Sequence, residues 1–236
     1  MDEFKYSGEE LDIFEQATNW KMYWSDLVRP HIGKRVLEVG AGLGATAVAL
    51  KSVEFERWVS VEPDAILCEK IKEKIRTMKI SNKTELMSCV ISDIPKYERF
   101  DTVLYIDVLE HIEKDTDELE IAANLLDEGG RIVIVSPAHN FLFSPFDRKI
   151  GHFRRYNKTM LKNIVPPIMK LVDVRYLDSI GFFASLANRI VLKSSDPKPS
   201  QVMFWDCYMV PLSRLIDPLI SYSAGKSIMA VMRKGV

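Results

Sequence analysis

The 236-residue sequence is poor in cysteine, in long apolar runs and in charge of one sign. Its three cysteines, Cys68, Cys89 and Cys207, are widely spaced and form no Cys-x-x-Cys pair, which argues against a disulfide framework or a zinc site. No apolar run approaches the length of a transmembrane helix, and the acidic, polar start MDEFKYSGEELD does not resemble a secretory signal. These absences predict a reduced, cytoplasmic setting.

Basic and acidic residues nearly balance, at 32 against 33. Without a basic excess the chain lacks an overall electrostatic footprint for a polyphosphate, so we expect no nucleic-acid partner. No cluster with metal-ligand spacing is visible in the sequence, so we expect no metal. The length suffices for one α/β domain with some chain left for a lid or cap, and a hydrophobic content of 47% is enough for a core.

The stretch from Arg35 to Leu50, RVLEVGAGLGATAVAL, reads as a buried strand, a tight turn and the start of a helix that runs to about residue 52. Gly40, Gly42 and Gly44 allow positive φ and let a ligand lie against bare backbone. The helix start offers free N–H groups to the same ligand. Because Gly40-x-Gly42-x-x-Ala45 also fits the dinucleotide fingerprint, the glycines alone leave NAD open.

Glu38 lies at the end of the buried strand, where a carboxylate needs a partner. A cofactor with a positive charge would satisfy it and a pyrophosphate would not, which favours a sulfonium or ammonium ligand. The pattern Glu38-x-Gly40-x-Gly42-x-Gly44 resembles motif I of the class I S-adenosylmethionine (SAM)-dependent methyltransferases. The resemblance implies that Glu38, Gly40, Ala41, Gly42 and Gly44 hold SAM and its product S-adenosylhomocysteine (SAH).

Strands and helices then alternate, which predicts a parallel, doubly wound sheet. Further strands are expected at 58–61, 85–91, 100–106 and 131–135, with helices at 65–78 and 115–126 and a turn at 127–130. The resemblance implies that the last two strands, 171–177 and 227–232, pair antiparallel. The fold class expected is therefore a Rossmann-like seven-stranded α/β sheet with a helical cap insert.

Acidic residues follow two of these strands. Glu62 comes 22 residues after Gly40, where a carboxylate suits the two ribose hydroxyls of an adenosine, in SAM or in NAD. Pro63 follows it and is included in the predicted cofactor site. The resemblance implies that Asp93 accepts the exocyclic amine of adenine and that Ile94 lies beside the ring.

The segment Val108-Leu109-Glu110-His111 resembles the motif IV region of the same superfamily and argues against a dehydrogenase. The resemblance implies that Ile106 and Asp107, just before this segment, lie by the methionine part of SAM. A histidine at the position of His111 more often holds local structure in related enzymes than takes part in chemistry.

The long polar loop at 139–156 follows the fifth strand, where loops tend to carry function. His139 and His152 are candidate general bases, because histidine titrates near neutral pH. A lone histidine in a loop is, however, more often structural than catalytic.

The same loop ends in a segment, Gly151-His152-x-Arg154-Arg155-Tyr156, that resembles one in a bacterial branch of class I methyltransferases. Arg154 and Arg155 could hold an anionic group of the acceptor, with Tyr156 beside them. Alternatively, these arginines pair with Asp147 or with glutamates and lock the loop.

The chain is interpreted as a single methyltransferase domain, 1–236, in four parts. Residues 1–34 form an N-terminal lid with an aromatic-rich helix at 9–28, 35–178 the SAM-binding core, 179–224 a helical cap insert with a helical part at 202–220, and 225–236 the last strand. The cap could close an acceptor pocket, form the face of a homodimer or touch a membrane. It carries few basic residues, which disfavours the membrane. Simple packing of the cap on the domain is the favoured interpretation.

The function predicted from the sequence is SAM-dependent methyl transfer to a small molecule. O-methylation of a sugar, natural product or lipid-linked precursor is favoured, by an in-line displacement in which positioning contributes about 7–11 kcal/mol. One alternative is an NAD-dependent oxidoreductase, which leaves Glu38, Asp93 and the motif IV segment unexplained. The other is a non-catalytic SAM-binding scaffold protein.

Overall fold

The computed structural model describes residues 10–77, 83–187 and 198–235. In these ranges one sheet of seven strands runs in the order β3-β2-β1-β4-β5-β7-β6. The strands are β1 Arg35–Val39, β2 Arg57–Val61, β3 Thr84–Met87, β4 Phe100–Ile106, β5 Leu126–Pro137, β6 Met169–Leu177 and β7 Ser227–Lys234. Strand β7 pairs antiparallel with β5 and with β6, and the other pairs are parallel. The predicted Rossmann-like sheet with an antiparallel last strand is confirmed.

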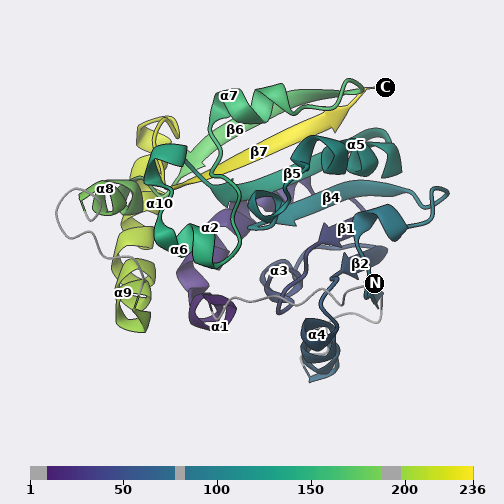
Figure 1. The fold of residues 1–236 in the computed structure, drawn as a ribbon, viewed down its shortest axis with the longest axis horizontal. Helices are drawn as coiled ribbons and strands as arrows, with labels where there is room; N and C mark the ends of the chain where they lie inside the picture. The colour runs from purple at the N-terminus through teal and green to yellow at the C-terminus, as the bar shows by residue number, and fades with distance from the viewer. Residues whose placement is uncertain (1–9, 78–82, 188–197, 236) are drawn as a thin grey trace.

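Helices cover both faces of this sheet (Figure 1). They are α1 Glu10–Glu15, α2 Thr18–Val28, α3 Ala45–Ala49, α4 Ala65–Thr77, α5 Asp115–Leu125, α6 Pro145–Lys149, α7 Lys158–Asn163, α8 Ser179–Ala187, α9 Pro199–Phe204 and α10 Val210–Leu219. Side chains alternate across a strand, so Val103 and Tyr105 of β4 face a core shared with α5 and α7. Leu104 faces the other core, shared with α2, α3 and α10.

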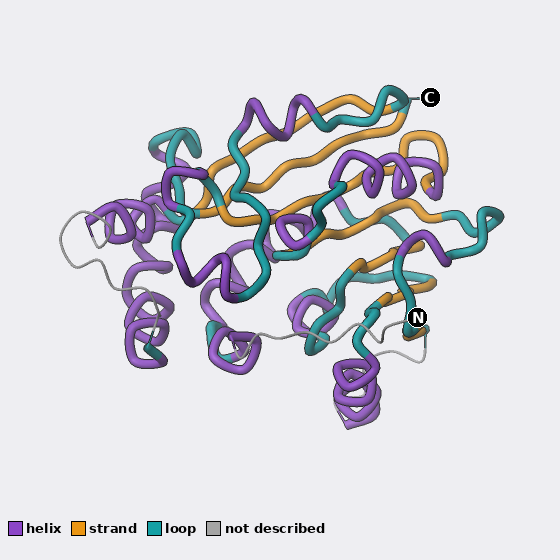
Figure 2. Tube along the Cα trace, in the orientation of Figure 1, coloured by secondary structure: helices purple, strands orange, loops and turns teal. Residues whose placement is uncertain are grey.

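Helices α8, α9 and α10 gather at one end of the sheet, beside α1 and α2 (Figure 2). Buried carboxylates fasten this cluster to α2. Asp206 accepts the backbone N–H of Trp20 at 2.8 Å, and Asp217 accepts the hydroxyl of Tyr23 at 2.6 Å. Since both carboxylates are fully buried, α2 and the C-terminal helices pack as one unit.

Two predicted helices differ from the observed ones. The expected helix 9–28 is interrupted after α1, and α2 begins at Thr18. The expected helical part 202–220 is helical without a break as far as Leu219, but Trp205–Met209 forms a wider π-helical turn between α9 and α10.

Two predicted strand boundaries are also wrong. The expected strand 85–91 ends at Met87, and a 3-10 turn follows at Ile91–Asp93. Residues 127–130, expected as a turn, belong to β5, which begins at Leu126. The pairing of β4 with β5 shifts register there, and Gly129 has a φ of +74°. A β-bulge inserts extra residues into one strand without ending it. The two glycines that the sequence analysis placed in a turn after the helix therefore lie within the strand.

Parts of the predicted lid and cap lie outside the described residues, namely 1–9 and 188–197. Met78, the predicted end of the helix at 65–78, lies outside them too. Over the described ranges, no helix combines the length and the apolar character that crossing a bilayer requires.

Candidate active site

The glycine turn joins β1 to α3 at the carboxyl edge of the sheet. Gly40, Gly42 and Gly44 have φ values of +66°, +56° and +71°, in the left-handed region that favours glycine. A Cβ on Gly40 would lie 2.7 Å from the methyl carbons of Val108, so no side chain fits there. The strand and the tight turn expected from the sequence are therefore present, whereas the helix that follows ends at Ala49 and not at about residue 52.

A cavity of about 970 Å³ opens beside this turn. Residues Gly40, Ala41 and Gly42 form one edge, and Ile106 and Asp107 at the end of β4 form the adjoining edge. Helices α1, α2, α8 and α9, together with the loop after β5, complete the walls. The cavity therefore lies where open parallel sheets bind ligands, outside the carboxyl ends of the strands.

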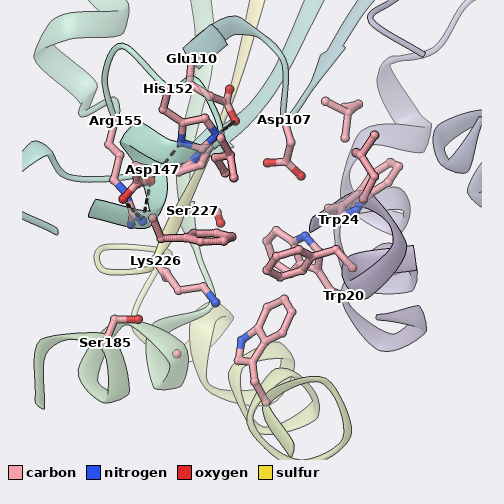
Figure 3. A pocket seen from close by; sticks show the side chains of 18 of the residues that line it. Trp20, Trp24, Asp107, Glu110, Asp147, His152, Arg155, Ser185, Lys226 and Ser227 are labelled. Carbon is pink, nitrogen blue, oxygen red and sulfur yellow. Dashed lines mark hydrogen bonds and ion pairs between the residues drawn. The ribbon is translucent and has the colours of Figure 1, made fainter. Parts of the chain in front are cut away.

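Aromatic rings make up much of the cavity wall (Figure 3). They come from three separate segments: Phe14, Trp20 and Trp24 from α1 and α2, Phe143 and Phe146 from the loop after β5, and Phe204 and Trp205 from the C-terminal helices. The ammonium group of Lys226 lies 3.7 Å from the centroid of the Trp205 ring and 3.6 Å from Asp178 Oδ2. This wall can stack against a planar group.

Two carboxylates, those of Asp107 and Glu110, also line the cavity. Asp107 has a positive φ of 54° and is open to the cavity. Burial within the protein and the neighbouring Glu110 charge raise the pKa of Asp107 to about 7. Glu110 is fully buried, and burial raises its pKa as well. One Glu110 oxygen accepts the hydroxyl of Ser136 at 2.8 Å.

His152 is held against the same wall by a network around Asp147. Nδ1 of His152 lies 3.0 Å from Asp147 Oδ1, and Arg155 donates two hydrogen bonds to this carboxylate at 2.8 and 2.9 Å. Burial alone would raise the pKa of Asp147, but the His152 hydrogen bond and the Arg155 charge hold it well below its usual range. The sequence alternative in which an arginine pairs with Asp147 thus describes Arg155, which still lines the cavity.

His111 lies edge-on to His152, with ring centroids 4.4 Å apart. Burial and the neighbouring His152 lower the pKa of His111 to about 3, so its imidazole is neutral at physiological pH. Glu110, His111 and Lys226 line the cavity but were not predicted as site residues. The motif IV segment contained Glu110 and His111, and only the folded chain shows that they face His152.

The other predicted cofactor residues are not part of the cavity wall. The Glu62 oxygens accept the backbone N–H groups of Gly42 at 2.8 Å and Asp64 at 3.0 Å, so this carboxylate braces the turn. Asp93 is exposed and accepts the N–H of Val90 at 3.3 Å. Gly44, Pro63 and the buried Ile94 also lie off the cavity wall.

Glu38 is buried on the face of β1 that packs toward α2 and α3. Its Oε2 accepts hydrogen bonds from Trp58 Nε1 at 2.9 Å and from Ser60 Oγ at 2.7 Å. Burial raises the pKa of Glu38, and the hydrogen bonds from Ser60, Trp58 and Thr46 oppose the shift. The protein thus provides partners for Oε2, whereas Oε1 is buried and accepts no hydrogen bond from the residues that the structure describes.

Three predicted catalytic or substrate residues lie off the cavity wall. His139 stacks on Tyr176, with ring centroids 4.6 Å apart. Arg154 pairs with Asp115 at 2.5 Å, and the fully buried Tyr156 donates its hydroxyl to the same carboxylate at 2.7 Å. The structure thus brings His152 and Arg155 to the cavity and leaves these three in supporting positions.

The strand order, the glycine turn and the cavity at its edge together define a SAM-dependent methyltransferase. A family model described as "Methyltransferase domain" matches residues 21–166, and the chain belongs to that family. SAM is its cofactor, and SAH is bound in similar structures.

Solved structures share the fold across nearly the whole chain. The cyclase SpnF superposes with a TM-score of 0.65 at 14% identity, covering 97% of this chain and 95% of that one. Coclaurine N-methyltransferase bound to N-methylheliamine and SAH has a TM-score of 0.62 at 16% identity, over 98% and 76% of the two chains. Magnesium protoporphyrin IX methyltransferase from Synechocystis, with bound SAH, has a TM-score of 0.56 at 12% identity, over 95% and 84%.

Curated relatives overturn the expected acceptor. The chain is 25% identical over 175 residues to tRNA U34 carboxymethyltransferase of Aliivibrio salmonicida, covering 70% of this chain and 51% of that protein. It is 32% identical over 125 residues to the enzyme of the same name from Shewanella amazonensis, covering 50% and 37%. The chain thus spans about half the length of the Aliivibrio salmonicida enzyme and 37% of the length of the Shewanella amazonensis enzyme. The predictions of a small-molecule acceptor and of no nucleic-acid partner are wrong. They relied on the net charge of the whole chain, which says little about the side chains that line one cavity.

Proposed function

We propose that this protein transfers a methyl group from SAM to a nucleoside of an RNA, with tRNA as the first substrate class to test. The observation that carries the proposal is the aromatic wall of the cavity beside the glycine turn. Sequence-specific proteins recognise RNA mostly at unpaired bases, which are turned out of the helix and stacked on aromatic side chains. The names of the curated relatives support the same class of substrate.

The cofactor fits the edge of the cavity formed by the turn. Gly40 leaves a cradle that a Cβ would fill, because Val108 packs directly against it. Asp107 faces the cavity next to Ile106 and is suited to pair with the cationic methionine end of SAM. Glu62 lies on the far side of the turn, where it can accept ribose hydroxyls with the lone pairs that its two backbone hydrogen bonds leave. SAM supplies an activated methyl group.

The base is proposed to enter between the two aromatic-lined sides of the cavity. Trp20 and Trp24 stand on one side of it and the loop carrying His152 and Arg155 on the other (Figure 3). Stacking on such rings contributes about 1–3 kcal/mol per base. Arg155 is already paired with Asp147, so it serves mainly to fix the loop in place.

The predicted subdivision of the chain is retained as part of this proposal. Residues 1–34 supply α1 and α2 as the lid side, and residues 179–224 supply the cap side, with 35–178 as the SAM-binding core. Leu11 of α1 lies 3.8 Å from the place of a Cβ on Gly42, so α1 covers the turn directly. The cytoplasmic setting inferred from cysteine usage stays a prediction.

The test is methyl transfer from radiolabelled SAM to total tRNA, followed by digestion to nucleosides and mass spectrometry, which identifies both the nucleoside and the group added. Phe204→Leu removes a ring that lines the cavity yet is 53% exposed, so folding should survive. We expect at least about a tenfold loss in kcat/KM for RNA, the lower part of the stacking range.

Tyr97→Leu is the matched control, because Tyr97 is 80% exposed and lies off the cavity wall. It should behave like the wild type. No label in tRNA, or equal effects of the two substitutions on RNA turnover, would refute the proposal.

A further inference from the structure

Three side chains with metal-binding atoms meet on the cavity wall: Glu110, His111 and His152. One ligand atom from each lies within 4.8 Å of the others, and all three residues line the cavity. Glu110 and His111 come from the 3-10 turn after β4, and His152 comes from the loop after β5. The fold therefore assembles a group that no local spacing in the sequence displays.

Glu110 has an oxygen that needs a partner. Its side chain is fully buried, and Oε1 accepts no hydrogen bond from the residues that the structure describes. This oxygen lies 3.9 Å from His152 Nε2, which is too long for a hydrogen bond. An unpaired buried carboxylate oxygen is costly, and here it points across a gap toward an imidazole nitrogen (Figure 3).

His152 is oriented for a ligand at that gap. Its Nδ1 faces Asp147 Oδ1 at 3.0 Å, and the ionised Asp147 can only accept. When Nδ1–H donates this hydrogen bond, a neutral imidazole has its lone pair on Nε2, the nitrogen that faces Glu110 Oε1. A histidine ligand whose other ring nitrogen donates to a carboxylate is the usual second-layer arrangement around protein-bound metals.

We propose that Glu110, His111 and His152 bind a divalent transition-metal ion through one carboxylate oxygen and two imidazole nitrogens. Two histidines and one carboxylate with an open position are the ligand set of catalytic zinc and of non-haem iron(II) sites. Ligands at about 2.1 Å from an ion lie at most about 4.2 Å apart, so a small side-chain adjustment closes the 4.8 Å group around it. Asp147 is a positioning residue for this site.

The ion would share the cavity with the acceptor. A metal at this position binds and polarises an acceptor oxygen or nitrogen, which lowers the pKa of the atom that must lose a proton. The inference rests on the ligand geometry and holds whether or not RNA is the acceptor. It departs from the sequence, which predicted no metal.

The experiment is a titration of the purified, metal-stripped full chain with Co²⁺, followed by visible absorption and by calorimetry. We expect one Co²⁺ per chain, with d–d absorption bands that Zn²⁺ abolishes on displacement. His111→Gln and His152→Gln should each weaken Co²⁺ binding by at least about 100-fold, and Asp147→Asn by about 10–100-fold.

His31→Gln is the matched control, since it makes the same chemical change at a histidine outside the cluster. It should bind Co²⁺ like the wild type. Thermal melting by circular dichroism verifies that each variant is folded, and the two histidine variants keep the test valid if Glu110→Gln does not fold. Absence of one-to-one binding, or binding that survives both cluster variants, would overturn the inference. Because the readout is metal binding, RNA methylation can fail without affecting it.

Discussion

Replacing Glu38 by Gln and by Ala separates the charge of this side chain from its hydrogen bonds. Glu38 is only 2% exposed, and its Oε2 accepts from Trp58 and Ser60 of the neighbouring strand. Ala leaves both donors without this acceptor, and a buried unsatisfied group costs about 1–3 kcal/mol. Trp58 keeps a second acceptor in Ser60 Oγ at 3.2 Å, which limits the loss. We therefore expect Glu38→Ala to lower the free energy of unfolding by about 2–4 kcal/mol. The amide oxygen of Gln can accept from the same donors, so Glu38→Gln should lie within about 1 kcal/mol of wild type.

The direction of the Glu38 pKa shift determines whether stability rises or falls with pH. Burial raises the pKa of Glu38 above its ordinary 4.5 in the folded protein. Protonated Glu38 therefore contributes stability that is fully present below the unfolded-state pKa and is lost as pH rises through the folded-state pKa. Gln does not titrate, so the stability of Glu38→Gln relative to wild type should increase as pH rises above 4.5. Urea unfolding of the two proteins, between about pH 4 and pH 8, measures this difference.

The reasoning is refuted if the difference is constant, or if wild type gains on Glu38→Gln as pH rises, since either result means that burial does not raise the pKa. SAM binding supplies a second readout. Because Glu38 lies off the cavity wall, Glu38→Gln should bind SAM nearly as wild type does. A large loss of SAM affinity at unchanged stability would place the carboxylate against the cofactor, as the sequence suggested.

Three further substitutions test the turn and the loop. Glu62→Ala should weaken SAM binding at least about tenfold by calorimetry, because it removes the proposed ribose acceptor and the brace of the glycine turn. Gly40→Ala should lower both stability and SAM affinity, because its Cβ would lie 2.7 Å from Val108, and a normal thermal melt would contradict this. Arg155→Met should destabilise by about 3–5 kcal/mol in urea, since it leaves the Asp147 charge buried without its guanidinium partner. An unchanged midpoint would show that the remaining hydrogen bonds to that carboxylate suffice.

The sequence predicted what depends on neighbours along the chain. Gly40 and Gly42 needed positive φ because a strand turns directly into a helix there, and both have it. Strand and helix alternation predicted the sheet, because right-handed parallel crossovers leave few other arrangements. Boundaries failed where tertiary pairing decided them, as at residues 127–130, which form a bulge in β5 between the Phe100–Leu126 and Thr102–Arg131 pairs with β4.

The site was harder to predict because it depends on which side chains meet in space. Register places Ser60 beside Glu38 across β1 and β2, and Ser60 and Trp58 donate to one oxygen of a carboxylate that the sequence left open for a cofactor. Similarly, His139 and His152 look equivalent in one loop. The fold stacks His139 on Tyr176 and turns His152 toward Glu110, a difference that no local pattern records.

The error about the acceptor has a physical cause of the same kind. A net charge of −1 sums the whole chain and measures long-range attraction to a phosphate backbone, which sets nonspecific affinity. Recognition of one unpaired base depends instead on stacking and on a few groups at its edge. The cavity is lined by rings such as Trp20 and Phe204 and by the Glu110–His152 group. A chain whose positive and negative charges balance can therefore contain a nucleoside-binding site. Its net charge is informative about its nonspecific affinity for RNA rather than about the presence of such a site.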